Sequence, residues 1–234
     1  MAKIPEWKKA IQSSLKENIS KIGSSATYAS LATVRENNTP AVRTIVIRGF
    51  AGEHHKEQVG WQSNILLIMT KNSSAKVKEL TKNPKTEINW YMDGTKEQFR
   101  IGGTIDIIEK NFDQSKLNHL SASVTKTNQG AENDKKSLGL QSFLKRQGDK
   151  DKFDWEAERL RQFIQCSSSL RADMIRGDTK ELEIKSIDLK TGWFQNDDIQ
   201  DLLEQSFEKF TLLAVTVQSV GYYSAETGNM KSML

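Results

Sequence analysis

Residues 40–50 read PAVRTIVIRGF, with β-branched residues throughout and an arginine near each end. This composition predicts a β-strand, in which successive side chains point to opposite faces. One face carries Arg43, Ile45 and Ile47, and the other carries Thr44, Val46 and Arg48. A guanidinium is always charged and forks onto phosphate or carboxylate oxygens, so the strand is a candidate anion site. The alternative from this pattern alone is two surface arginines on a partly buried strand.

The neighbouring segments predict further antiparallel strands. YASLATV at 28–34 is rich in strand formers, and the turn residues at 36–40 make it a hairpin with Ala41–Phe50. Additional strands are expected at 64–70, 85–92, 97–109, 210–217 and 220–223. The run at 64–70 is almost entirely apolar, which predicts burial on both faces. The glycine pair Gly102-Gly103 indicates a bulge or a close backbone approach.

Helical spacing of apolar residues predicts the rest of the secondary structure. Helices are expected at 5–22, 73–81, 153–164 and 167–176. Antiparallel strands with a late returning strand point to a small barrel, so the expected fold class is mainly β with flanking helices. The segment 113–152 is rich in Ser, Asn, Gln, Lys, Asp and Gly. We expect a single domain over residues 1–234 that carries this segment as a polar, mobile insertion.

The composition excludes several classes of protein. One cysteine in 234 residues excludes a disulfide framework and a multi-thiolate metal site, and three histidines leave no metal centre to expect. No apolar run approaches the ~20 residues of a membrane span, and no secretory h-region is visible, so we expect a cytoplasmic protein, with the nucleus left open. The net charge of +4 is a weak hint of an anionic partner. Nucleic acid is a poor candidate because the cations are evenly spread, whereas a phosphate-bearing ligand fits.

Two more motifs carry groups suited to ligand binding. Thr70 to Lys76 joins a strand end to a helix start, where hydroxyls, free N–H groups and a lysine form an anion site. The ordinary alternative is an N-cap by Asn72 or Ser73 with the lysine in solvent. Gln98 can pair with both a donor and an acceptor on a heterocycle edge, or it can be an exposed strand residue. No catalytic triad, paired carboxylates or Walker-type loop is visible, so no catalytic residue is assigned.

In their order along the chain, these motifs resemble the FMN-binding split barrels of the pyridoxamine 5′-phosphate oxidase superfamily. The sequence is most similar to the branch of Alr4036-type pyridoxamine 5′-phosphate oxidase-like proteins. The resemblance rests on residues 28–34, residues 40–50, Thr70 with Ser74 and Lys76, Trp90-Tyr91, and residues 98–103. It implies a split β-barrel with FMN bound at a dimer interface, and therefore a homodimer.

The resemblance also implies a role for each matching residue. Arg43 and Lys76 would hold the FMN phosphate with Ser74, and Thr44, Ile45, Val46 and Ile47 would lie along the isoalloxazine ring. Arg48 would lie near flavin and substrate, Met69 and Thr70 would line the ribityl or phosphate side, and Gln98 would reach the ring from the second subunit. A dianionic phosphate needs fixed cations, and a redox flavin needs an apolar strand with directed hydrogen bonds at its edge.

The chain also departs from the family pattern. Lys71 stands where an acidic residue is common, and no arginine occurs at Ser73 or Ala75, so one phosphate cation is missing. The C-terminal residues 228–234, GNMKSML, lack the Arg-x-His substrate motif, which argues against pyridoxal phosphate synthesis. We therefore expect an FMN-dependent oxidoreductase with an unknown small substrate. The alternative is a non-catalytic FMN-binding protein: a carrier, a sensor or a degenerate homologue.

Overall fold

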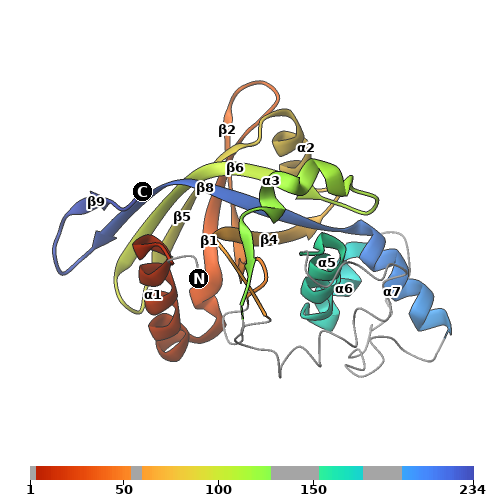
Figure 1. Cartoon of the computed structure of the whole chain (residues 1–234), viewed down its shortest axis with the longest axis horizontal. Coiled ribbons are helices and arrows are strands. Elements are labelled where there is room, and N and C mark those ends of the chain that lie inside the picture. Colours follow the sequence, from red (N-terminus) through yellow and green to blue (C-terminus); the bar gives the residue numbers. More distant parts are fainter. Residues whose placement is uncertain (1–3, 54–59, 128–152, 176–196) are drawn as a thin grey trace.

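The computed structural model describes residues 4–53, 60–127, 153–175 and 197–234 (Figure 1). Six of its strands form one barrel: β1 (Tyr28–Val34), β2 (Pro40–Phe50), β4 (Ile65–Lys71), β5 (Lys85–Met92), β6 (Glu97–Ile108) and β8 (Phe210–Ser224). They are antiparallel neighbours in the order β4-β2-β1-β5-β6-β8, and a further β4–β8 pairing closes the barrel. The predicted fold class, mainly β with flanking helices in a barrel, is confirmed.

Three short strands lie outside the barrel wall. β9 (Met230–Ser232) pairs with the end of β8 and was not among the expected strands. β3 (Trp61–Ser63) pairs with β7 (Val124–Lys126) as a separate two-stranded sheet.

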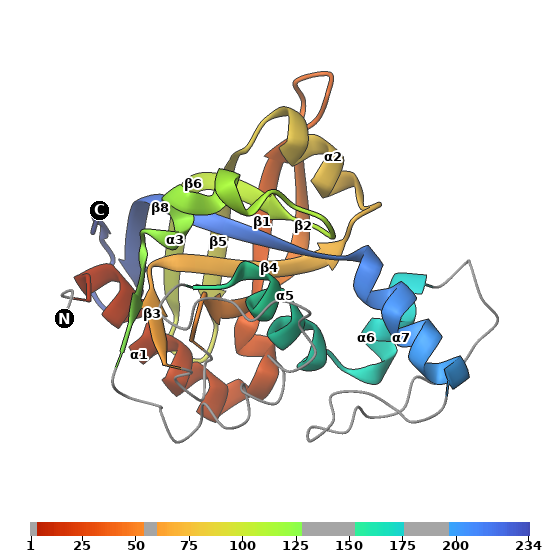
Figure 2. The same cartoon turned by 45° about the vertical axis from the view of Figure 1, so that its right-hand side comes forward.

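The helices occupy separate regions around the barrel. They are α1 (Glu6–Ile22), α2 (Ala75–Lys82), α3 (Asn118–Ser121), α5 (Trp155–Ile164), α6 (Ser168–Ile175) and α7 (Asp197–Lys209), with 3-10 turns at Gly23–Thr27 and Gln114–Leu117. In both Figure 1 and Figure 2, α1, α2 and the group α5–α7 lie at three separate positions around the barrel. No helix in the described part of the chain is long and apolar enough to cross a membrane.

Two apolar clusters share the strands β4 and β8. Leu66 and Ile68 point into the barrel, where α1 packs, and Ile65 and Leu67 point outward to the cluster that includes α5 and α6. β8 does the same, with Leu213 inside. The prediction that the 64–70 strand is buried on both faces is therefore confirmed, because helices cover the outer face of this part of the barrel.

The glycine pair in β6 marks an irregularity, as predicted. The β6–β8 register shifts between Gly102 and Gly103, so that β8 carries one residue more than β6 at this point. A Cβ added at Gly103 would lie 2.2 Å from the backbone oxygen of Thr216. Only glycine fits such an approach between two backbones.

Two parts of the structure differ from the local patterns. The expected strands at 210–217 and 220–223 are one strand, β8, because the shift at Gly102–Gly103 accommodates the extra residue without ending the ladder. Residues 113–127, the first part of the segment expected to be a polar insertion, form a 3-10 turn, α3 and β7. Leu117, Leu120 and Val124 from this part are buried in the outer cluster. Residues 128–152 lie outside the described residues.

Candidate cofactor site

The candidate site lies where the β1–β2 hairpin meets the short helix α2. Arg43 stands opposite Leu31 in the β1–β2 register, and α2 follows directly from the end of β4. The residue at the N-cap of α2 is Ser74, neither Asn72 nor Ser73, and its side chain makes no capping hydrogen bond. The N–H groups of Ala75 and Lys76 therefore have no side-chain cap and can face a ligand, whereas the Val77 N–H donates to the Ser74 carbonyl at 3.0 Å.

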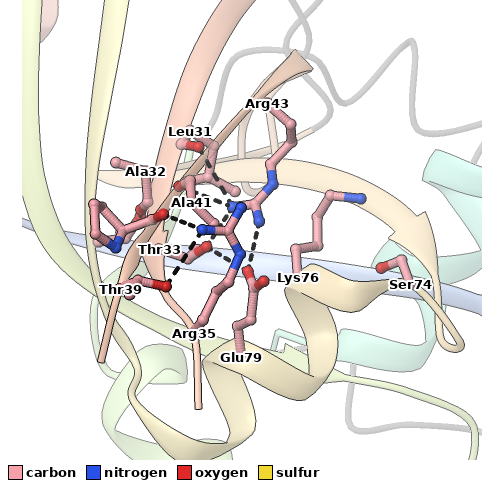
Figure 3. Close-up of polar contacts among 12 residues, drawn as sticks. Leu31, Ala32, Thr33, Arg35, Thr39, Ala41, Arg43, Ser74, Lys76 and Glu79 are labelled. Atoms are coloured by element: carbon pink, nitrogen blue, oxygen red, sulfur yellow. Dashed lines mark hydrogen bonds and ion pairs between the residues drawn. The ribbon is translucent and has the colours of Figure 1, made fainter. Parts of the chain in front are cut away.

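Arg43 is held by a carboxylate from α2. Its Nη2 lies 2.5 Å from Oε2 of Glu79, and its Nη1 donates to the hydroxyl of Thr33. The Thr33 hydroxyl in turn donates to Glu79 Oε2 at 2.5 Å. Figure 3 shows these contacts, and the side chains of Arg43 and Glu79 are only 23% and 11% exposed, so the ion pair is largely buried. Burial raises the pKa of Glu79, but the bonds from Thr33 and Arg43 outweigh it, and the pKa is lowered.

Lys76 rises from the first turn of α2 on the same side as Glu79 (Figure 3). Its Nζ donates to the Thr70 hydroxyl at 2.9 Å, and Thr70 donates to Ser74 Oγ at 3.0 Å. Within the described part of the chain Lys76 forms no ion pair. Burial lowers the pKa of the Lys76 ammonium, the nearby charge of Arg43 lowers it further, and Glu79 partly offsets both. The structure thus brings together four predicted residues, Arg43, Thr70, Ser74 and Lys76.

The middle of β2 has an open backbone edge. β1 pairs with β2 from Pro40 to Val46, whereas β4 pairs with it only from Ile47 onward. Among the described strands, nothing pairs with the second edge of Arg43–Val46. Ile45 and Ile47 are buried in the barrel, while Thr44 is exposed and Val46 is half-buried on the outer face, as the alternation predicted. Backbone donors and acceptors are therefore free for a ligand along this edge.

Arg48 and Met69 lie farther along, next to the loop between α5 and α6. The Nε of Arg48 is buried and has no hydrogen-bond partner among the described residues. Burial lowers the pKa of Arg48, with the thiol of Cys166 and the hydroxyl of Tyr28 acting the other way. Cys166 Sγ lies 3.2 Å from Met69 Sδ, and burial raises the pKa of its thiol to about 11. Cys166 is therefore a buried, protonated thiol.

Gln98 is not part of this group. It lies on β6 opposite Tyr91 and donates to Asn89 Oδ1 at 2.7 Å. The strands β1 and β5 separate β6 from β2 in the barrel. Its expected role at the ring, from a second subunit, stays a prediction.

Glu79 and Thr33 both contact Arg43, and neither was expected from the sequence. One signal for Glu79 was available, since it follows Lys76 by three residues on the same helix and so shares its face. Thr33 gave no such signal, because its contact depends on the β1–β2 register.

The comparisons with known proteins agree with this architecture. Residues 4–109 match the family model "Pyridoxamine 5′-phosphate oxidase, FMN-binding domain". A curated relative, pyridoxine/pyridoxamine 5′-phosphate oxidase 2 of Arabidopsis thaliana, is 36% identical over 115 residues. That match covers 49% of this chain and 52% of the relative, so the chain spans about half the length of that protein.

A solved structure extends the likeness to the whole chain. It is a pyridoxamine 5′-phosphate oxidase-related, FMN-binding protein from Nostoc punctiforme PCC 73102, with a TM-score of 0.59 and 20% sequence identity. The superposition covers 98% of this chain and 97% of that protein. At this identity the likeness concerns the fold, and it is the split barrel of that group. Residues 4–109 are therefore similar to the pyridoxamine 5′-phosphate oxidase FMN-binding domain, and the chain folds as a barrel of the split-barrel type.

Proposed function

We propose that this chain binds FMN, with the phosphate between Arg43 and Lys76. The observation that carries the proposal is the meeting of these two half-buried cations with the hydroxyls of Thr70 and Ser74 at an uncapped helix N-terminus. A phosphate ester carries about −1.5 to −2 charges near neutral pH and accepts hydrogen bonds on three oxygens. Two cations, two hydroxyls and the N–H groups of α2 match that demand.

The flavin ring would then lie along β2. Arg43 and Arg48 are five residues apart, about 16 Å along a strand, which leaves room for phosphate, ribityl chain and ring in a row. The free edge of Thr44, Ile45 and Val46 offers backbone donors and acceptors, with Ile47 and Met69 beyond. Arg48, whose buried Nε has no hydrogen-bond partner in the described part of the chain, would face the ring or a substrate.

We infer an oxidoreductase of the pyridoxamine 5′-phosphate oxidase-like type that acts on a small molecule. Bound FMN supplies reversible two-electron chemistry, and the residues around it bind and orient the reactants. The curated relative is a pyridoxine/pyridoxamine 5′-phosphate oxidase, which supports this reaction class. A non-catalytic FMN-binding protein is the second candidate, because GNMKSML at 228–234 lacks the substrate motif of the oxidases. The single cysteine suits the reducing cytoplasm, which we propose as its compartment.

We also propose a homodimer that pairs the outer faces of β1, β2 and β5. Tyr28, Val42 and Tyr91 are 51%, 67% and 47% exposed there, and large apolar side chains at this exposure favour an interface. A second subunit would also bring a Gln98 to the ring from outside.

Flavin binding is tested first by the absorption spectrum of the purified protein and by titration of flavin-free protein with FMN. We expect a flavin band and saturable binding. Protein that stays colourless in excess FMN would refute the proposal. Anaerobic bleaching of the band by pyridoxamine 5′-phosphate or NAD(P)H, with recovery in oxygen, would support the oxidoreductase. A bound flavin that no reductant of either kind bleaches would favour the carrier or sensor.

A further inference from the structure

Glu79 places a negative charge inside a site that is otherwise built for an anion. Its Oε2 lies 2.5 Å from Arg43 and accepts the Thr33 hydroxyl at the same distance. Its side chain is only 11% exposed. A carboxylate at this position is unexpected for a phosphate site, because it repels the ligand that Arg43 attracts.

We propose that Glu79 is a built-in counter-anion: it balances Arg43 in the flavin-free protein and lowers the affinity of the site for the FMN phosphate. The inference rests on the proposed FMN site and concerns how strongly that site holds its ligand.

Charge balance supports this role. The nearby charge of Arg43 lowers the pKa of Lys76, and Lys76 has no ion pair among the described residues. Without Glu79, neither of these two half-buried cations would have an ion-pair partner among the described residues. The carboxylate neutralises one of the two positive charges when the ligand is absent. When the ligand binds, its phosphate neutralises positive charge in the site.

The geometry separates the charge of Glu79 from its shape. Arg43 and Thr33 both donate to one carboxylate oxygen, Oε2. The amide oxygen of a glutamine can accept the same two hydrogen bonds without the charge. Glu79→Gln therefore keeps Arg43 oriented and deletes only the negative charge.

The test compares FMN with riboflavin, which has the same ring but no phosphate. In Glu79→Gln we expect FMN to bind about tenfold more tightly than in the wild type, and riboflavin to bind equally in both. The flavin-free variant should melt at a lower temperature than the wild type, while the rise in melting temperature on adding FMN should be larger. Glu36→Gln is the matched control, since Glu36 pairs with Lys82 of the same helix but is 87% exposed. It should change none of these values.

Several results would overturn the inference. Wild-type protein that binds FMN, combined with an E79Q variant that binds it equally or more weakly, leaves Glu79 as a structural partner of Arg43 only. A parallel gain for riboflavin would mean that the charge acts on the ring and not on the phosphate. If E79Q folds only in the presence of a ligand, rescue by FMN and not by riboflavin keeps the assignment, and a variant that neither flavin rescues overturns it. Wild-type protein that binds no FMN refutes the proposed function itself, and with it this role.

Discussion

Lys76 is the cation of the site that remains available to a ligand. Arg43 forms an ion pair with Glu79, whereas the ammonium of Lys76 donates only to the Thr70 hydroxyl among the described residues. We predict that Lys76→Met weakens FMN binding about 10- to 100-fold, because a charge-assisted hydrogen bond contributes about 1.5–3 kcal/mol. Riboflavin affinity should stay the same. Fluorescence titration with both ligands measures this, and Lys78→Met, an exposed lysine of the same helix, is the control. An equal loss for riboflavin would contradict a phosphate contact.

The lowered pKa of Glu79 gives the flavin-free protein a defined acid response. Because the folded-state pKa lies below the ordinary value of 4.5, the ionised carboxylate stabilises the fold at pH values above 4.5. That contribution disappears as the pH falls through the folded-state pKa. We predict that the stability difference between wild type and E79Q is constant from neutral pH to about pH 5 and shrinks in more acidic solution. Urea unfolding across this range measures it, and a difference that grows on acidification would contradict the assignment.

At the scale of elements, the barrel depends on the close approach of the β6 and β8 backbones at Gly103. A Cβ there would lie 2.2 Å from the Thr216 backbone oxygen, and neither strand can move without breaking its ladder. We predict that Gly103→Ala destabilises the fold by about 3 kcal/mol, as overpacking against backbone does. Gly221→Ala in β8 is the control, because a Cβ added there would lie no closer than 3.4 Å to its nearest neighbour, Met230 Sδ. Equal urea midpoints for the two variants would show that this close approach tolerates a side chain.

Elements with a strong local pattern could be predicted, and those fixed by distant partners could not. Pro5, the apolar stripe to Ile22 and Gly23 define α1, and Asp93-Gly94 separates β5 from β6. β8 was divided in two because its exposed stretch around Gln218 looks like a strand end. Its continuity comes from the β6 ladder, which no local pattern contains. The burial of Leu117 and Leu120, in the polar segment after Asp113, could not be predicted for a similar reason. A few apolar residues among many polar ones give no helical or strand periodicity.

For the whole molecule, the motif residues were found but the contacts between motifs were not. Residue types at Arg43, Thr70, Ser74 and Lys76 suggested an anion site, and the fold brings them together. Arg43 and Glu79 are 36 residues apart, and Met69 and Cys166 are 97 apart. Such pairs exist only once the hairpin has closed on α2 and the helices have covered β4. The open edge of β2 is likewise a property of the closed barrel and of no single segment.

The outer face of β1, β2 and β5 carries the proposed dimer interface. Val42 is 67% exposed and stands beside Ala32 in the β1–β2 register, on the same face as Tyr28. A charge at this position costs a monomer little, but it would be buried without a partner in the proposed dimer. We predict that the wild type sediments as a dimer, and that Val42→Lys sediments as a monomer with an unchanged circular dichroism spectrum. The nearly isosteric Val42→Thr should stay dimeric. Because Gln98 lies three strands away from Arg43 within one chain, the monomeric variant should also lose FMN affinity. A monomer that keeps full FMN affinity would mean that one chain alone completes the ring site, and the role expected for Gln98 would be wrong.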